Sequence, residues 1–431
     1  MGFLLAVIYT ILFIFLIYKL KFFQNSCLPP KAISGIFLLK IFFGVMLWAI
    51  YTWHYGNRNT SDSFKYFDDA SFIYNALFIN PVHYLQMVTG FNADDPELMV
   101  YYENMNSWFK KYDYGLYNDN RTVIRFNALA YLFSFGYYPV HIVIWCFMSL
   151  TGLMAVYKWT HPMLKDKGKE LIVAVFLLPS VLFWGSGVLK EGILLFAFGL
   201  AIYHFNKLIN NKYNLKTIAW AIVSFTLLVF TKGYVILALV PGLLSLIIVK
   251  MTGNKYTGLK FLLTHLVLLL IAINLYRVNQ EYDMLFYLYQ KQKDFINLSV
   301  LTEVKSFIET PIFQPNWKSL FLNGPEALFN VLARPLIFES SGLLILAAAA
   351  ENTILLAIGL FSIIYFKKPE REQLPLLFFS IFFVISLSLI IGYVTPVIGA
   401  IVRYKIPMLP FFLIIFIIIA DKEKIIKKLT F

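Results

Sequence analysis

The chain has 431 residues, of which 59% are hydrophobic and only 14% are charged, and its formal net charge at pH 7 is +13. So few charged residues cannot cover a soluble globule of this size, which excludes a soluble fold and makes lipid the expected solvent for most of the chain. The positive charge follows from membrane topology and a bias toward anionic lipid, so no nucleic-acid partner is predicted. Neither a metal nor a cofactor is predicted, because Cys and His show no metal-site spacing.

Apolar stretches follow one another along the whole chain, and most of about eleven approach the roughly 20 residues that a helix needs to cross the hydrocarbon. Because lipid cannot satisfy exposed backbone groups, they predict an all-α, polytopic integral membrane bundle. The stretches are 2–20, 33–55, 140–156, 171–184, 188–205, 217–230, 235–249, 261–275, 342–366, 374–394 and 397–420. The fourth and the sixth are short, so tilted, broken or re-entrant segments are expected there.

Lysine and arginine collect in alternate loops, and in short loops these residues mark the cytoplasmic side of a membrane. Examples are Lys19, Lys21, Lys31, Lys158, Lys165, Lys207, Lys212, Lys250, Lys255, Lys367, Lys368 and Lys422. The pattern predicts an N-terminus on the outer side of the membrane and a C-terminus on the cytoplasmic side; the resemblance described below makes the outer side periplasmic. Cys27 then falls in a cytoplasmic loop and Cys146 in a span, so no disulfide is expected.

Two long segments, 56–139 and 276–341, lie on the opposite, outer side of this topology. Both mix acidic and aromatic residues with amphipathic turns, which are typical of short helices at a membrane surface. Their Trp and Tyr rings form an interfacial belt or stack on sugar rings, and the two interpretations stay open. The prediction is one integral membrane domain, 1–431, with two large periplasmic loops.

Basic residues near the outer ends of spans are the candidates for binding a phosphate group, since a charge at the bilayer centre costs about 2.5–3.5 kcal/mol on insertion scales. Lys190 lies in PSVLFWGSGVLKEG, where Pro179 and two glycines predict a helix break and a new helix N-terminus that favours anions. The alternative for Lys190 is that it and Glu191 only neutralise each other at the membrane edge, and the alternative for Arg403 and Lys405 is that these long side chains extend to lipid headgroups. The candidates are Lys190, Lys232, Arg334, Arg403 and Lys405.

Five carboxylates are candidates for catalysis, and each also has a structural interpretation. Asp68 and Asp69 are neighbours in an outer loop, where one carboxylate raises the pKa of the other and favours a general base. Glu351 is predicted inside a span, where it is either functional or paired with a basic residue of another helix. Arg121 and Arg125 follow in the same outer loop, where two basic residues four apart on a surface helix either face a cavity shared with these aspartates or, more often, meet lipid headgroups. The full set of carboxylates is Asp68, Asp69, Glu191, Glu339 and Glu351, with Asp62 as a weaker companion.

Four segments carry a resemblance to a known group: PSVLFWGSGVLKEG, LARPLIFES with AAAAEN after it, GAIVRYKIPMLPF and RFNALAYLFSFGYY. They resemble bacterial O-antigen and exopolysaccharide repeat-unit polymerases. The resemblance implies a multi-pass inner-membrane glycosyltransferase that joins polyprenyl-diphosphate-linked oligosaccharide units at the periplasmic face during surface polysaccharide synthesis. It also implies that membrane lipids are partners of the chain and that a chain-length regulator is an optional protein partner. Arg334 and Arg403 match the outer arginines expected of the group.

The charged residues predict a cavity open to the outside in which a diphosphate contacts Lys190, Arg403 and Lys405 while a carboxylate takes a proton from an acceptor hydroxyl. Two alternatives remain. Asp68 and Asp69 also resemble the acidic first outer loop of glycosyltransferases that use polyprenyl-phosphate sugars. A transporter or flippase of lipid-linked glycans would use the same outer cations together with Glu351.

Overall fold

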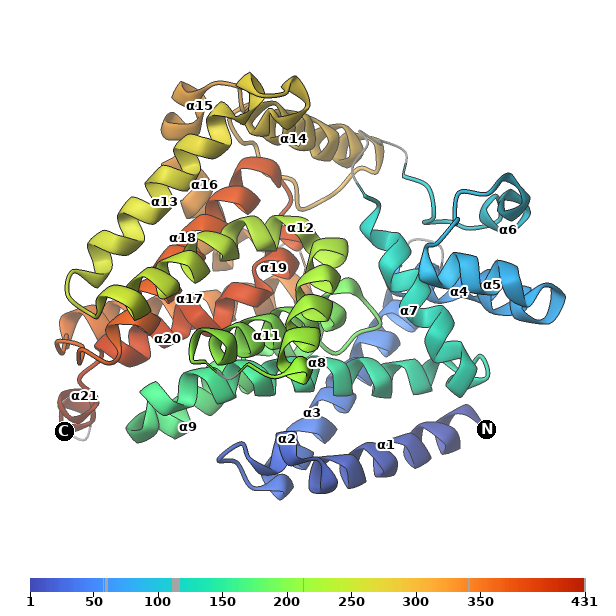
Figure 1. The fold of residues 1–431 in the computed structure, drawn as a ribbon, viewed down its shortest axis with the longest axis horizontal. Helices are drawn as coiled ribbons and strands as arrows, with labels where there is room; N and C mark the ends of the chain where they lie inside the picture. The colour runs from blue at the N-terminus through green and yellow to red at the C-terminus, as the bar shows by residue number, and fades with distance from the viewer. Residues whose placement is uncertain (57, 59–60, 111–116, 212, 340–341, 430–431) are drawn as a thin grey trace. The chain divides into compact units, whose positions relative to one another are not determined.

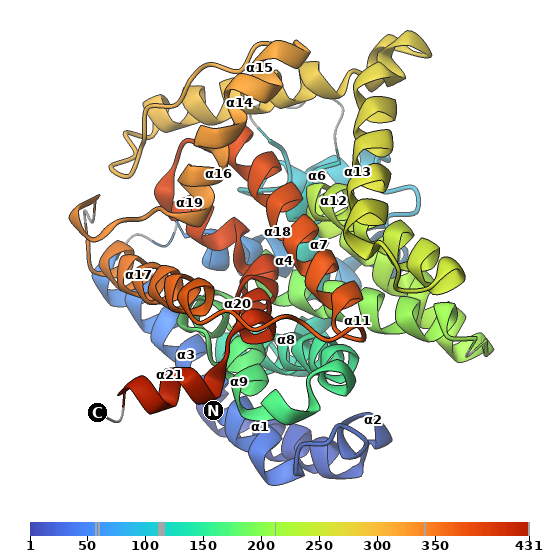
Figure 2. The same cartoon turned by 90° about the vertical axis from the view of Figure 1, so that its left-hand side faces the viewer.

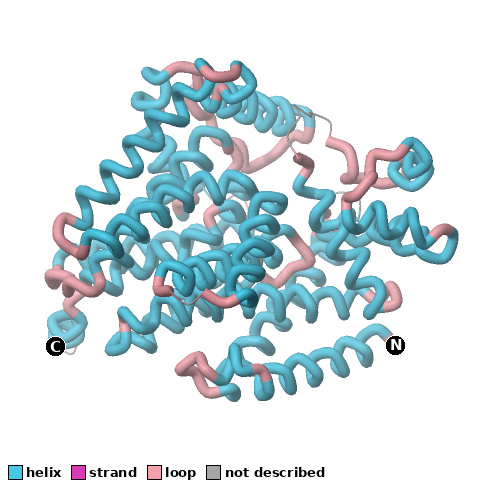
Figure 3. The backbone as a smooth tube through the Cα atoms, in the orientation of Figure 1, coloured by secondary structure: helices cyan, strands magenta, loops and turns pink. Residues whose placement is uncertain are grey.

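The structure, a computed structural model, describes the chain except residues 57, 59–60, 111–116, 212, 340–341 and 430–431 (Figure 1). Within the described residues no strand forms, and only two isolated antiparallel bridges pair Phe307 with Val397 and Phe366 with Ala420 (Figure 3). Nearly all of the remaining backbone is helix or short connection. The prediction of an all-α fold is confirmed.

Eight of the described helices are long and apolar enough to cross a membrane, and a ninth crossing results if the bent pair Ile398–Tyr404 and Ile406–Ile419 is one span. The eight are Gly2–Lys19, Pro30–His54, Tyr138–Met163, Lys190–Ile209, Leu215–Thr252, Thr257–Arg277, Leu343–Ile364 and Leu374–Val394. Such a series of apolar helices defines a multi-pass helical membrane protein. Its orientation and the membrane in which it lies stay predictions.

The predicted number of about eleven spans is not confirmed, and two local features explain the difference. The stretch 171–184 is divided into α9 (Gly168–Ile172), a π-helix (Val173–Leu177) and α10 (Pro179–Trp184), none of which is long enough to cross. The stretches 217–230 and 235–249 are the two helical parts of α12 (Leu215–Thr252), which meet at a kink and count as one candidate span. Inside α12, Lys232 leaves helical geometry with φ −154° and ψ 83°.

The chain divides into two compact units, which are described separately; unit 1 comprises Met1–Trp159 and Val181–Gly233, and unit 2 comprises Thr160–Ser180 and Tyr234–Phe431. The main helices of unit 1 are α1 (Gly2–Lys19), α2 (Lys21–Gln24), α3 (Pro30–Ala49), α4 (Asp62–Ile79), α5 (Pro81–Thr89), α6 (Met99–Tyr102), α7 (Asp119–Ser134), α8 (Tyr138–Thr160) and α11 (Lys190–Ile209). Helices α4 to α7 therefore form within the first predicted outer loop.

In unit 2 the main helices are α13 (Thr257–Asn274), α14 (Met284–Leu301), α15 (Trp317–Leu322), α16 (Gly324–Leu332), α17 (Leu343–Ile364), α18 (Leu374–Val394), α19 (Ile398–Tyr404), α20 (Leu409–Ile419) and α21 (Lys422–Leu429). Helix α18 lies against α13, α14, α16 and α20 (Figure 2). It approaches α16 closely because Gly392 has no side chain: a Cβ there would lie 2.2 Å from the carbonyl oxygen of Ala327. The second predicted outer loop thus carries helices packed on this core.

The packing of α8 against α11 in unit 1 depends on two glycines. A Cβ on Gly199 would lie 1.9 Å from the carbonyl oxygen of Gly152, and a Cβ on Gly152 would lie 2.0 Å from that of Leu195. Small residues let helix backbones approach closely, as is common between helices in membranes. The contact holds α11, and with it Lys190 at its N-terminus, in a fixed place.

Residues 185–189 separate α10 from α11, as the proline and glycines in this segment predict. Three carbonyl groups of the break are satisfied from neighbouring helices of unit 1. The Nζ of Lys40 donates to Gly185 at 3.2 Å, the Sγ of Cys146 to Ser186 at 3.5 Å, and the Nε1 of Trp145 to Leu189 at 3.0 Å. Irregular backbone within a membrane is tolerated where protein satisfies it in this way.

Candidate functional site

The segment before α7 is held by polar contacts that begin at Asp69 on α4. The buried carboxylate of Asp69 accepts hydrogen bonds from the backbone N–H groups of Asn106 and Ser107, both at 2.7 Å. On the other side, the side chain of Asn118 donates to the carbonyl oxygen of Trp108 at 2.9 Å. These bonds hold residues 106–110 against the N-terminus of α7.

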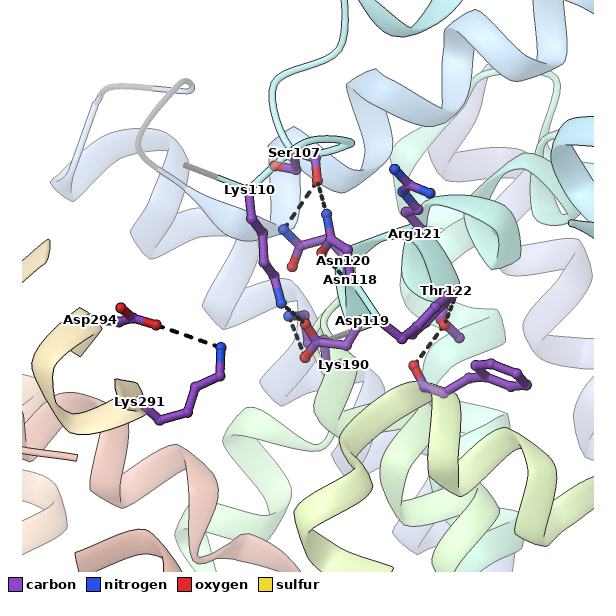
Figure 4. Close-up of polar contacts among 12 residues, drawn as sticks. Ser107, Lys110, Asn118, Asp119, Asn120, Arg121, Thr122, Lys190, Lys291 and Asp294 are labelled. Atoms are coloured by element: carbon purple, nitrogen blue, oxygen red, sulfur yellow. Dashed lines mark hydrogen bonds and ion pairs between the residues drawn. The ribbon is translucent and has the colours of Figure 1, made fainter. Parts of the chain in front are cut away.

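Asp119, in the first turn of α7, lies between two lysines (Figure 4). Its Oδ1 is 2.6 Å from the Nζ of Lys110, and its Oδ2 is 2.8 Å from the Nζ of Lys190. Lys190 is the first residue of α11, so its ammonium group adds to the positive end of that helix. The side chain of Asp119 keeps 24% of its surface exposed. It can therefore be reached from outside the cluster.

Lys232 and Glu191 extend the cluster into the interior of unit 1. The Nζ of Lys232 is 3.9 Å from Oε1 of Glu191, and the two side chains are 5% and 0% exposed. Lys232 lies at the break in α12, and the hydroxyl of Thr122 donates to the carbonyl oxygen of Phe230 just before that break, at 2.8 Å (Figure 4). Helix α7 therefore binds the broken helix directly. We name Lys110, Asp119, Lys190, Glu191 and Lys232 the lysine cluster.

The electrostatics of the lysine cluster favour anions. Burial alone would raise the pKa of Asp119, but Lys190, Lys110 and Lys232 together hold it well below its usual range. The carboxylate is therefore ionised at neutral pH. Three ammonium groups against two carboxylates leave an excess of positive charge beside a helix N-terminus, which is an arrangement that can bind phosphate.

Lys405, one of the predicted phosphate-binding residues, is buried in unit 2. Its Nζ donates to the carbonyl oxygens of Val331 and Arg334 at 3.2 and 3.1 Å, and to Oδ1 of Asn352 at 3.1 Å. An ammonium group has three donors, so these three bonds use all of them. In this structure Lys405 joins α17 to the C-terminal end of α16.

Other predicted residues of unit 2 are also engaged in local contacts. Arg334 Nε is 2.9 Å from Oε1 of Glu339, whose Oε2 accepts from the backbone N–H of Leu336 at 2.9 Å. The carboxylate of Glu351 accepts hydrogen bonds from the backbone N–H and the hydroxyl of Ser180. Arg403 is partly buried near the end of α19.

The two neighbouring aspartates of α4 have separate environments. Asp68 forms a two-pronged ion pair with Arg58, whose Nε lies 2.7 Å from Oδ2 of Asp68. Asp69 has no exposed surface, and burial raises its pKa while the hydrogen bonds from Asn106 and Ser107 lower it. Its bonds to backbone groups give Asp69 a structural role in ordering residues 106–110.

Two predicted arginines of α7 pack against aromatic rings. The guanidinium carbons of Arg121 and Arg125 lie 4.9 and 5.4 Å from the ring centroid of Trp108. Arg125 also donates to the carbonyl oxygen of Met87 at 2.8 Å. Both side chains therefore fix the loop to α7.

The structure thus brings together Lys190, Glu191 and Lys232 of the predicted set within unit 1. Arg334, Glu339 and Lys405 meet within unit 2 through the carbonyl group of Arg334. Sequence reasoning missed Lys110 and Asp119. The available signal was the segment NDNRT, in which Asn118 and Asp119 have the composition of a helix cap and first turn, but that pattern does not reveal a lysine partner 71 residues away.

In the described part of the chain, no group of three or more His, Cys, Asp or Glu side chains is arranged to hold a metal ion. No protein-family model, curated protein or solved structure matches the chain. Fold and site together define its class: a multi-pass helical membrane protein with a cluster of lysines and carboxylates at a helix N-terminus. The resemblance to polysaccharide polymerases stays a prediction.

Proposed function

We propose that the chain is an inner-membrane glycosyltransferase that polymerises polyprenyl-diphosphate-linked oligosaccharide units at the periplasmic face, and that the lysine cluster binds the diphosphate. The observation that carries the proposal is the position of Lys110 and Lys190 on either side of Asp119 at the N-terminus of α11. Ammonium groups bind phosphate oxygens through charge-assisted hydrogen bonds, which are stronger than neutral ones. A helix N-terminus adds unpaired backbone N–H groups to the same site.

Binding of a diphosphate would change the chemistry of Asp119. In the free protein, the neighbouring lysines hold its pKa below the usual range, so it is a weak base. A diphosphate that takes over Lys110 and Lys190 offsets their charge, and its own negative charge raises the pKa of Asp119. The substrate therefore activates the carboxylate as a general base when it binds.

The reaction is a displacement at the anomeric carbon. Asp119 removes the proton from an acceptor hydroxyl, and the hydroxyl oxygen forms a bond to that carbon. The bond from the carbon to the diphosphate oxygen breaks, and its electron pair leaves with the polyprenyl diphosphate, which the lysines stabilise. General-base assistance of this kind contributes about 10²–10⁴-fold.

Within unit 2, the proposal gives no direct substrate role to Lys405, because its three donors bind protein oxygens. Arg334 and Glu339 pair with each other after the end of α16, and Glu351 accepts hydrogen bonds from Ser180 at the start of α10, so all three already have partners. For Arg403, phosphate binding stays a prediction that rests on the resemblance to polymerases alone.

The test is the length of surface glycan chains in a bacterium whose copy of this gene carries Lys190→Gln. We expect loss of long chains while single repeat units persist, because the glutamine keeps the size but removes the charge that holds the diphosphate. The matched control is Lys318→Gln, which changes an exposed lysine at the start of α15. Normal chain lengths in Lys190→Gln, at normal protein level, would refute the proposal.

The same strains distinguish transport from polymerisation. A flippase predicts that lipid-linked units accumulate on the cytoplasmic leaflet when the gene is deleted. A polymerase predicts that they reach the periplasmic leaflet and remain single. Labelling of exposed glycan on spheroplasts separates these two outcomes.

A further inference from the structure

A second site lies in unit 2, at the end that the sequence predicts to be cytoplasmic. An open cavity of about 340 Å³ is lined by residues of α9, α17, α20 and α21, which lie together in Figure 2. Its walls are mainly apolar and include Ile358, Phe361, Phe416 and Ile417. Two of these side chains, Ile358 and Phe361, keep 37% and 48% of their surface exposed. Cavities of roughly 300–1,000 Å³ are typical of small-molecule sites.

The rim of the cavity carries two lysines that its apolar walls do not explain. The Nζ of Lys167 donates to the carbonyl oxygens of Ile417 and Ile418 at the end of α20. Lys422 pairs with Glu170 and keeps 55% of its side chain exposed. Burial, and then the nearby Lys367, lower the pKa of Lys167. With more than half of its side chain exposed, Lys422 places an accessible positive charge at the mouth.

The composition of helix α21 indicates that the mouth of the cavity lies at the membrane surface. Its sequence, KEKIIKKL, places four lysines and one glutamate around two isoleucines and a leucine. Short helices of this composition lie at the boundary between headgroups and acyl chains. Ile425 of α21 lines the cavity together with residues of α17 and α20, so this helix contributes one part of the wall.

We propose that this cavity binds one acyl chain of an anionic phospholipid, whose headgroup phosphate contacts Lys422. Charge complementarity carries the choice of lipid: the walls accept a hydrocarbon chain, and the rim and α21 carry an excess of lysine. Basic residues next to a membrane attract anionic headgroups, whereas a zwitterionic headgroup offers no net charge. The site is independent of the proposed diphosphate site and does not rest on it.

The test uses the full chain in nanodiscs that contain phosphatidylglycerol with a photoreactive diazirine near the end of one acyl chain. After irradiation, mass spectrometry locates the label. We expect labelled peptides that contain Phe361 and Phe416, at a level about fivefold above that of phosphatidylcholine with the same acyl chains. Two variants separate headgroup from chain: Lys422→Gln is expected to bring phosphatidylglycerol labelling to the phosphatidylcholine level, and Ala420→Leu, which fills the cavity, to reduce both.

The matched control is Lys31→Gln, an exposed lysine at the start of α3 that is predicted on the same side of the membrane. Its labelling is expected to equal that of the parent chain. Equal labelling by the two phospholipids in the parent chain would overturn the proposal. So would full labelling in Ala420→Leu, or stronger labelling by a photoreactive polyprenyl phosphate than by phosphatidylglycerol.

Discussion

Lys405 and Lys190 are lysines next to helix breaks, but their ammonium groups have different partners. Lys405 donates to two carbonyl oxygens and one amide oxygen, all neutral acceptors buried around it. Lys190 instead faces a carboxylate that is itself partly exposed and shared with Lys110. A ligand can replace Asp119 as the partner of Lys190 without leaving a backbone group unpaired. Moving Lys405 to a ligand would instead leave buried carbonyl groups without a hydrogen bond, at a cost of about 1–3 kcal/mol each.

The pH dependence of stability tests the environment of Asp119. Because its pKa is lower in the folded chain than in the unfolded one, its contribution is present above the usual carboxyl range, near about 3.9, and is lost as the pH falls toward the folded value. We expect Asp119→Asn to reduce the free energy of unfolding by about 1–2 kcal/mol at pH 7. Denaturant unfolding in micelles measures this difference, which should persist at pH 5 and shrink below pH 4.

The control for this measurement is Asp94→Asn, whose side chain is 90% exposed and pairs with Arg121 at 3.5 Å. Exposed ion pairs contribute little, so a change of at most about 0.5 kcal/mol is expected. A difference for Asp119→Asn that is absent at pH 7, or that grows as the pH falls, would contradict the assigned ion pairs.

At the residue scale, the sequence predicted some of the cations of the site but not their partners. Lys190 and Lys232 could be found because charge at the end of an apolar stretch needs a physical reason. Asp119 and Lys110 lie in a polar loop, where charges are ordinary and carry no such signal. For Glu351 the position inside a span could be predicted. Its partner could not, because the hydrogen bond that it accepts from Ser180 joins segments that are far apart in the sequence.

At the scale of elements, breaks rather than whole helices place the functional groups. The break at 185–189 could be predicted, because proline and glycines interrupt an apolar run there. An interruption near Lys232 could also be predicted, because the apolar stretches 217–230 and 235–249 end and begin on either side of it. The contact of Thr122 with Phe230 at this kink depends on tertiary structure and could not.

The crossing of α8 and α11 is tested by Gly199→Ala. Alanine is the better helix former by about 1 kcal/mol, but its Cβ would lie 1.9 Å from the carbonyl oxygen of Gly152, so the helices must separate. We expect a net loss of about 1–3 kcal/mol in the free energy of unfolding, measured with denaturant in micelles. Gly35→Ala is the matched control, because nothing lies within 4 Å of a Cβ at that exposed position of α3.

The two glycine variants are expected to change the free energy of unfolding differently: Gly199→Ala lowers it, and Gly35→Ala does not. Gly35→Ala should be neutral or stabilising by up to about 1 kcal/mol, because only helix propensity changes. If Gly199→Ala were as stable as Gly35→Ala, the close approach of the two backbones would be wrong. The placement of Lys190 by α11 would then lose its physical basis.

For the whole molecule, composition and hydropathy were sufficient to predict an all-α membrane protein, because the solvent of an apolar helix is decided by its own residues. The number of spans was harder to predict. Hydropathy alone predicts an interruption between 217–230 and 235–249, but not whether the two helices that meet at the kink in α12 make one crossing or two. It also cannot recognise the π-helical segment Val173–Leu177 as an interruption.

Orientation is tested with the native cysteines. Cys27 is exposed and lies between α2 and α3, on the predicted cytoplasmic side, whereas Cys146 is buried. We expect a membrane-impermeant maleimide to label Cys27 in inside-out vesicles but not in intact spheroplasts, with Cys27→Ser as the control that removes the signal. Labelling of Cys27 in intact spheroplasts would reverse the predicted topology and place the lysine cluster on the cytoplasmic side.

The most direct test of the central claim is binding of a short polyprenyl diphosphate to the purified full chain, measured by calorimetry in micelles at two salt concentrations. We predict binding that weakens with salt, and a loss of affinity of at least about tenfold when Lys110→Gln and Lys190→Gln are combined, because each lysine supplies a charge-assisted hydrogen bond. Lys318→Gln should bind as the parent chain does. Equal affinity in the double variant, or no affinity in the parent chain, would contradict the assignment of the lysine cluster as the diphosphate site.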